Sequence, residues 1–164
     1  MSGNRAAGHI ARAGIIAAVY ALLTVALAPI SSGLIQCRVS EALCVLPYFT
    51  SAAVPGLFLG CLISNLITGA PVYDVLFGSL ATLLAAAATR FLRNRASKYA
   101  APLPGVLLNV IIIGCVLVYG YGVNVPWWTA ALYVGAGQAL ACFGLGIPLL
   151  LVLERFSARL FFDE

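Results

Sequence analysis

A short polar run near residue 40 carries the side chains that are best suited to chemistry. Gln36, Arg38 and Glu41 lie within six positions of one another in an otherwise apolar chain. If the run opens a helix, Arg38 and Glu41 share one face, one turn apart. Ionisable groups at the edge of a bilayer are costly and usually functional, so we interpret the run as the mouth of a ligand site. The alternative is that Arg38 and Glu41 only pair with each other.

The remaining strong polar residues of the apolar segments cluster toward the same side. Asn65 ends one apolar segment, Asp74 begins the next, and Gln138 lies near the middle of the last. Asn109 lies about 9 Å from the opposite side by the helical rise. Structural interpretations exist for each, since Asp74 suits a helix cap and asparagines suit interhelical hydrogen bonds. The clustering favours a shared polar pocket for a small molecule.

Two adjacent tryptophans, Trp127 and Trp128, open the last apolar segment. One interpretation is an aromatic belt at the lipid interface, which is common in membrane proteins. The other is a stacking platform for a flat ligand. Neighbouring residues on a helix point about 100° apart, so at most one of the two tryptophans is expected to face a pocket.

Enzymatic chemistry fits the residue inventory poorly. The chain has one histidine, His9, and five scattered cysteines without a CxxC pair. No histidine or lysine is expected within the membrane to act as a base, so we expect no catalytic residue, no metal site and no cofactor. The sequence also lacks a G-x-x-x-x-G-K-[ST] phosphate loop, so we do not expect the chain to hydrolyse ATP.

Composition indicates the solvent that must surround these residues. Of 164 residues, 63% are hydrophobic and 9% are charged, whereas a soluble domain carries about 25% charged residues. We therefore expect a single domain over residues 1–164, embedded in the cell membrane with lipid as its surroundings. The net charge of +4 is interpreted as a topology signal and not as a nucleic-acid surface.

Six apolar segments are predicted to cross the bilayer as helices, which gives an all-α integral membrane fold. A span needs roughly 20 residues, and the second and third segments are short. Pro47 is expected to kink or break the second. A rival interpretation merges 39–70 into one span plus a re-entrant piece, giving five crossings. The six segments are 9–29, 39–52, 54–70, 74–93, 103–121 and 128–154.

The placement of basic residues favours six spans. Of the nine basic residues, all except Arg38 fall in the N-terminal region, the 90–102 connection or the C-terminal region. With six spans these three regions share one side, and the positive-inside rule makes that side cytoplasmic. The prediction is therefore N-in and C-in, with the connections 30–38, 70–74 and 121–127 outside.

Small residues recur at four-residue spacing on the first predicted helix, at Ala13, Ala17 and Ala21. Such stripes let helices approach closely in lipid. The stripe has two interpretations: packing inside this chain, or docking on a partner subunit.

Several motifs resemble those of one transporter family. The resemblance extends from about Arg12 to Leu150, and the first and last motifs are fairly specific together. The chain resembles the queuosine-precursor transporter (QueT) family in the segments Gln36–Leu43 with Leu46–Pro47, Pro55–Cys61 and Asp74–Thr82.

The resemblance implies the substrate-binding S component of an energy-coupling-factor (ECF) transporter. Such a component has six helices, binds its substrate near the outer face, and docks on a transmembrane subunit and two ATPase subunits. The resemblance places docking at Ala13, Ala17 and Ala21, and implies 7-deazaguanine precursors of queuosine as substrates. Gln138 departs from the pattern, since we expect Glu at this position in relatives.

The polar inventory suits such a ligand. A guanine-like ring offers two adjacent donors, which the carboxylate of Glu41 or Asp74 can accept together. The ring carbonyl needs a donor, for which Arg38, Gln36 and Asn65 are candidates. Two other functions stay open at this stage: a self-contained channel or facilitator for a small solute, and a membrane scaffold without a ligand.

Overall fold

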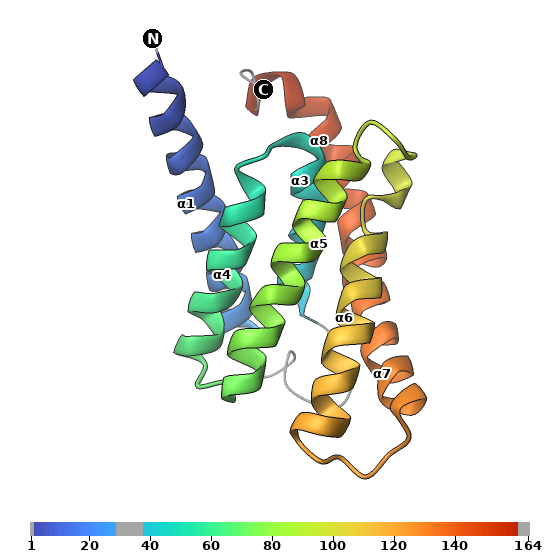
Figure 1. Cartoon of the computed structure of the whole chain (residues 1–164). Helices are drawn as coiled ribbons and strands as arrows, with labels where there is room; N and C mark the ends of the chain where they lie inside the picture. The colour runs from blue at the N-terminus through green and yellow to red at the C-terminus, as the bar shows by residue number, and fades with distance from the viewer. Residues whose placement is uncertain (1, 29–37, 161–164) are drawn as a thin grey trace.

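The computed structural model describes residues 2–28 and 38–160, and their side chains over 5–28 and 38–156. This described part is helical and contains no strand, which confirms the predicted all-α fold. Figure 1 shows a bundle of helices running up and down. In chain order the elements are α1 (Ser2–Ala26), η1 (Val39–Val45), α3 (Leu46–Phe49), α4 (Ala53–Ile67), η2 (Asp74–Gly78), α5 (Ser79–Leu92), η3 (Lys98–Ala100), α6 (Leu103–Cys115), η4 (Val116–Gly120), α7 (Trp127–Ala139), η5 (Leu140–Leu145) and α8 (Gly146–Leu160).

Four helical runs are long and apolar enough to cross a bilayer. Two further apolar helices, Val39–Phe49 and Ala53–Ile67, are shorter. All six correspond to the segments predicted from the sequence. The long runs are Arg5–Ala26, Asp74–Leu92, Lys98–Gly120 and Trp127–Phe156.

The helix over Val39–Phe49 is the buried centre of the bundle. It begins as the 3₁₀ helix η1 and becomes α-helical at Leu46, with Pro47 in the first α-helical turn, where its missing N–H is tolerated. The side chains from Ser40 to Pro47 are all buried. At Thr50 the backbone is extended, and the chain reverses into α4 (Figure 1). The segments 39–49 and 53–67 are therefore separate helices, and a single merged span over 39–70 does not form.

The ends of the bundle separate the charges as the sequence predicts. Both termini and the connection between α5 and α6 lie at one end, which is the upper end in Figure 1. The connections between α4 and η2 and between η4 and α7 lie at the opposite end. The three basic regions of the chain therefore gather at one end, and the polar residues 38–41 and 74 belong to the other half.

Helices α1 and α4 approach each other closely through small residues. A Cβ atom added at Gly56 would lie 2.9 Å from the carbonyl oxygen of Ala13, and one at Gly60 would lie 2.9 Å from that of Ala17. Ala13 and Ala17 are buried in this contact, and Ala21 is half-buried. In this conformation α4 of the same chain covers Ala13 and Ala17, which favours the interpretation that the stripe packs inside the chain.

Candidate ligand-binding site

Four of the polar residues that the sequence singled out meet in one enclosed cavity inside the bundle. Arg38, Glu41, Asp74 and Gln138 all line it, although they come from three separate parts of the chain. The cavity measures about 10 Å³, which is room for about one water molecule. The lining residues are Arg38, Glu41, Asp74, Gly78, Thr82, Asn109, Ile113 and Gln138.

Unusual helical turns aim these side chains inward. The amide of Glu41 donates to the carbonyl of Arg38 over 2.9 Å, so the two residues share the first turn of η1. Asp74 and Gly78 bound the π-helical turn η2, and another π-helical turn, η5, begins two residues after Gln138. π-Helical turns inside α-helices occur frequently at functional sites. All four predicted residues at the cavity therefore lie in or beside an irregular turn.

Glu41 is held from two sides. The Tyr20 hydroxyl on α1 donates to Glu41 Oε1 over 2.5 Å, and both residues are buried. The Cys142 thiol on η5 contacts the backbone oxygen of Glu41 at 3.6 Å. One turn along α1, the Thr24 hydroxyl donates to Ser40 Oγ over 2.7 Å. These contacts fix the central helix against α1. The second carboxylate oxygen of Glu41 receives no hydrogen bond from a described residue.

Arg38 and Glu41 do not form an ion pair with each other. Within the described ranges the Arg38 guanidinium makes a long hydrogen bond from Nη1 to Cys61 Sγ, at 4.0 Å. The interpretation that these two charges only pair with each other is therefore wrong for this conformation. A guanidinium at the cavity wall without a carboxylate partner is suited to binding a ligand oxygen.

The Asp74 carboxylate lies beside the Tyr121 hydroxyl. The Asp74 side chain caps no helix end, and it forms no ion pair with any residue that the structure describes. Its position is fixed through the backbone, since Asn65 Nδ2 donates to the Asp74 carbonyl over 3.1 Å. Burial and the neighbouring Asp74 carboxylate raise the pKa of Tyr121 to about 12, so Tyr121 stays neutral at physiological pH. The predicted capping role of Asp74 is not realised.

Unsatisfied polar atoms lie close to this carboxylate. Asn65 Oδ1 and the Tyr121 hydroxyl are buried and have no hydrogen-bond partner in the described part of the chain. Buried polar atoms are normally paired, because an unpaired one costs about 1–3 kcal/mol. Asn65 adjoins the cavity wall, since a Cβ atom added at Gly78 would lie 3.6 Å from its Nδ2. These atoms provide additional hydrogen-bonding capacity beside the cavity.

Comparison with known proteins assigns the chain to a family. The model of a family described as QueT transporter matches residues 10–155. The chain belongs to the QueT transporter family. A curated relative, the queuosine precursor transporter QueT of Lactococcus lactis subsp. cremoris (strain MG1363), is 42% identical over 72 residues. This match covers 43% of the chain and 42% of the relative, so it spans less than half of the relative's length. No solved structure matches.

Membership of a transporter family, together with the apolar helices, indicates a multi-pass protein of the cell membrane. The 10–155 match includes every residue that lines the cavity. The family is one of transporters, which supports the expectation that the chain is not an enzyme.

The cavity also contains residues that the sequence interpretation did not assign to it. Thr82 lies two helical turns after Asp74, and the four-residue spacing of Asp74, Gly78 and Thr82 places all three on one face. This spacing was visible in the sequence. Asn109 is buried at the cavity and donates to the Gly105 carbonyl over 2.9 Å. Its place depends on how α6 meets η1, and no local pattern indicates that contact.

The predicted tryptophans do not reach the cavity. Trp128 is 62% exposed, and the indole nitrogen of Trp127 packs against Gly114 on α6. Gln138 lies 11 positions after Trp127, about 16 Å further along the helix. The structure therefore does not bring Trp127 or Trp128 to this cavity, and their role in substrate binding stays a prediction. Gln36, which was also predicted to bind, lies outside the described residues.

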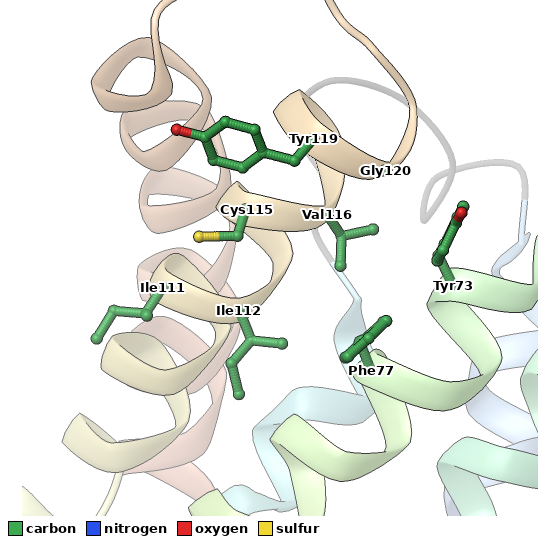
Figure 2. A pocket seen from close by; sticks show the side chains of 8 residues that line it. All are labelled: Tyr73, Phe77, Ile111, Ile112, Cys115, Val116, Tyr119 and Gly120. Carbon is green, nitrogen blue, oxygen red and sulfur yellow. The ribbon is translucent and has the colours of Figure 1, made fainter.

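A second, larger cavity is an apolar groove between η2–α5 and α6–η4. It measures about 460 Å³ and opens on the outer surface of the bundle. Figure 2 shows Tyr73 and Phe77 on one side of the gap, and Ile112 and Val116 on the other. A lining of this kind suits lipid and offers few partners for a polar ligand. The polar cavity is therefore the better candidate for a polar substrate site.

Proposed function

We propose that this chain is the membrane-embedded S component of an ECF importer and that it binds a queuosine precursor of the 7-deazaguanine type. Two observations support the proposal: the enclosed cavity that unites Arg38, Glu41, Asp74 and Gln138, and the similarity to a protein named as a queuosine precursor transporter. The cavity carries the proposal, because its donors and acceptors match the edge of a guanine-like ring.

In the proposed complex, Glu41 accepts the ring N1–H and the exocyclic amine. Tyr20 already occupies Oε1 from the α1 side and so fixes the orientation of the carboxylate toward the cavity. Arg38 donates to the ring carbonyl, since its guanidinium has no carboxylate partner among the described residues. The amide of Gln138 supplies a further donor or acceptor at the inner end. Two hydrogen bonds to one carboxylate are directional and distinguish guanine-like rings from adenine-like ones.

Binding requires the cavity to widen. Ligand sites usually measure about 300–1,000 Å³, and this cavity measures about 10 Å³. Among the charged wall residues, Arg38 is only half-buried and makes one weak contact to Cys61 at 4.0 Å. A rotation of the Arg38 side chain is the smallest movement that enlarges the site. The described structure is therefore interpreted as a closed conformation of the site.

In the proposed membrane arrangement six helices cross or enter the bilayer, with both termini in the cytoplasm. The basic residues at the terminal end of the bundle support this orientation through the positive-inside rule. The cavity then lies in the half of the protein that faces outward. Binding from outside and delivery to the cytoplasm is the direction of an importer.

A different face of α1 replaces the buried alanine stripe as the proposed docking surface. Ala7, Ala11, Gly14 and Ala18 are all exposed and follow one another at spacings of four and three residues. A Cβ atom added at Gly14 would meet nothing within 4 Å, so this face is open. Small residues on an open helix face let a partner helix approach closely. We assign this face to the ECF transmembrane subunit, which in turn binds the two ATPase subunits.

Uptake by proteoliposomes tests the proposal. The purified chain is reconstituted with and without the transmembrane subunit and the two ATPases, and entry of labelled 7-aminomethyl-7-deazaguanine is measured with ATP inside. We expect uptake only in the complete assembly. Uptake by the chain alone would instead support a self-contained facilitator, and the absence of saturable binding to the purified chain would support a scaffold.

A pair of variants tests the docking face within the same assay. Gly14→Trp places a large side chain on the open face, and is expected to abolish uptake while ligand affinity stays within about twofold. Leu84→Trp is the matched control, because Leu84 is 44% exposed on α5, away from α1. If Gly14→Trp supports normal uptake, the partner does not dock on this face.

A further inference from the structure

We propose that the site selects a positively charged ligand, and that Asp74 is the carboxylate that receives the charge while Glu41 reads the ring edge. This inference rests on the proposed function and narrows its substrate to a cation, such as the aminomethyl form of 7-deazaguanine. The neutral cyano form is the corresponding poor ligand. The cavity walls and the charge inventory of the chain carry the argument.

The charges at the cavity do not balance. Two carboxylates, Glu41 and Asp74, face it together with one guanidinium, Arg38. Its other polar lining groups, Thr82, Asn109 and Gln138, are neutral. With all three ionisable groups charged, the site holds one negative charge in excess. In a site shielded from water this excess favours a monovalent cation over a neutral ligand of similar shape.

No other charge in the chain is available to cancel this excess. The sequence contains five acidic and nine basic residues. The basic residues other than Arg38 belong to the two terminal regions and the 90–102 connection, at the far end of the bundle. The segment 29–37 contains no Asp, Glu, Lys, Arg or His. The count of charged residues that can face the cavity therefore does not depend on the structure of segment 29–37.

The surroundings of the two carboxylates divide their roles. Glu41 is bound at 2.5 Å by Tyr20, so one of its oxygens is occupied and its orientation is fixed. Asp74 has no ion-pair partner in the described part of the chain, and Asn65 holds only its backbone. A fixed carboxylate suits two directional hydrogen bonds from a ring edge. A carboxylate without an ion-pair partner suits an ammonium group, whose three donors can point in many directions.

Calorimetry with a matched ligand pair tests the inference. Binding of 7-aminomethyl-7-deazaguanine and 7-cyano-7-deazaguanine to the purified chain is measured for wild type, Asp74→Asn, Glu41→Gln and the control Glu154→Gln. Glu154 lies on α8 and pairs with Lys98, outside the cavity. Wild type and the control are expected to bind the aminomethyl form about 10- to 100-fold more tightly, the range of a charge-assisted hydrogen bond.

The variants are expected to separate the two carboxylates. Asp74→Asn should weaken the aminomethyl form by about 10-fold or more and bring the ratio of the two affinities close to one. Glu41→Gln should weaken both ligands by similar factors and preserve the ratio. If Asp74→Asn does not fold, the ratio of the two affinities in wild type still tests the preference for a charged ligand. The same ratio in Glu41→Gln then tests which carboxylate receives the charge.

Three results overturn the inference, and they differ from failure of the proposed function. If wild type binds both ligands equally, a proton neutralises the excess negative charge of the site and the site does not select a cation. If Glu41→Gln removes the preference, the two carboxylates are assigned the wrong way round. If Asp74→Asn keeps the preference, Asp74 does not receive the charge. If neither deazaguanine binds to wild type, the proposed function itself is wrong.

Discussion

Removal of one hydroxyl, in Tyr20→Phe, tests how the site is held together. The Tyr20 hydroxyl lies 2.5 Å from Glu41 Oε1, and Tyr20 and Glu41 are 1% and 4% exposed. Phenylalanine preserves the shape of the side chain, so the variant creates almost no cavity. It leaves a buried carboxylate oxygen without its donor. The expected effect on stability therefore comes from this hydrogen bond alone.

The magnitude follows from two general ranges. Hydrogen bonds to charged groups contribute about 1.5–3 kcal/mol, whereas interhelical hydrogen bonds in membranes average about 0.6 kcal/mol with a maximum near 1.7 kcal/mol. The Tyr20–Glu41 hydrogen bond is short, fully buried and made to a carboxylate. We therefore place its contribution at the lower end of the first range and the upper end of the second. We expect Tyr20→Phe to lower the free energy of unfolding by about 1.5–2 kcal/mol.

The assay is reversible unfolding of the purified protein in mixed micelles with increasing SDS, followed by circular dichroism. Tyr133→Phe is the matched control, because Tyr133 is 44% exposed on α7 and no hydrogen bond of its hydroxyl to a described residue is observed. The control should stay within about 0.5 kcal/mol of wild type. If Tyr20→Phe is as stable as the control, the hydrogen bond to Glu41 does not hold the central helix against α1.

Two further predictions concern helix packing and topology. Gly60→Ala places a Cβ atom 2.7 Å from Tyr20 Cβ, so it should lower the stability of the protein by about 1–2 kcal/mol even though alanine has the better helix propensity. In the same SDS titration, Gly14→Ala on the open face of α1 should cause no loss of stability. Equal stability of the two variants would contradict the close α1–α4 contact. Topology is tested in intact cells with a cysteine-depleted background and an impermeant maleimide. Val123→Cys should react and Ser97→Cys should not, because the basic 90–102 connection is expected in the cytoplasm. The reverse pattern would invert the orientation and place the site at the cytoplasmic face.

The sequence predicts the site better than it predicts the surfaces around it. Arg38, Glu41, Asp74 and Gln138 stand out because ionisable and amide groups are rare in apolar segments, and burial forces rare polar groups to share a cavity. Thr82 could have been predicted by the same reasoning, since it follows Asp74 at two helical turns. The contacts of Tyr20 were not, because a tyrosine on an apolar helix carries no sign of its partner on another helix.

The docking stripe is ambiguous in the sequence for a simple physical reason. Small residues occur on two faces of α1, and spacing alone does not distinguish the face that packs inside the chain from the open one. Gly56 and Gly60 on α4 complement Ala13 and Ala17, and that pairing becomes visible only when the two helices are placed together. The tryptophans illustrate the same limit, since an aromatic pair at a helix start suits an interface and a pocket equally well.

The irregular turns were also beyond local sequence reasoning. Pro47 predicted a break in the second helix, and the structure has a change from 3₁₀ to α geometry beside it. The π-helical turn η2, which bears Asp74, carries no comparable signal. These turns depend on how neighbouring helices pack, and they determine which side chains enter the cavity.

A structure of the protein in lipid nanodiscs, determined with 7-aminomethyl-7-deazaguanine bound, tests the central claim most directly. The account predicts the ring in a widened polar cavity, with its donor edge on Glu41, its carbonyl near Arg38 and its ammonium group at Asp74. The apolar groove between η2–α5 and α6–η4 is a larger cavity in the described part of the chain and serves as the comparison. Ligand density in that groove, with the polar cavity still closed, would contradict the account.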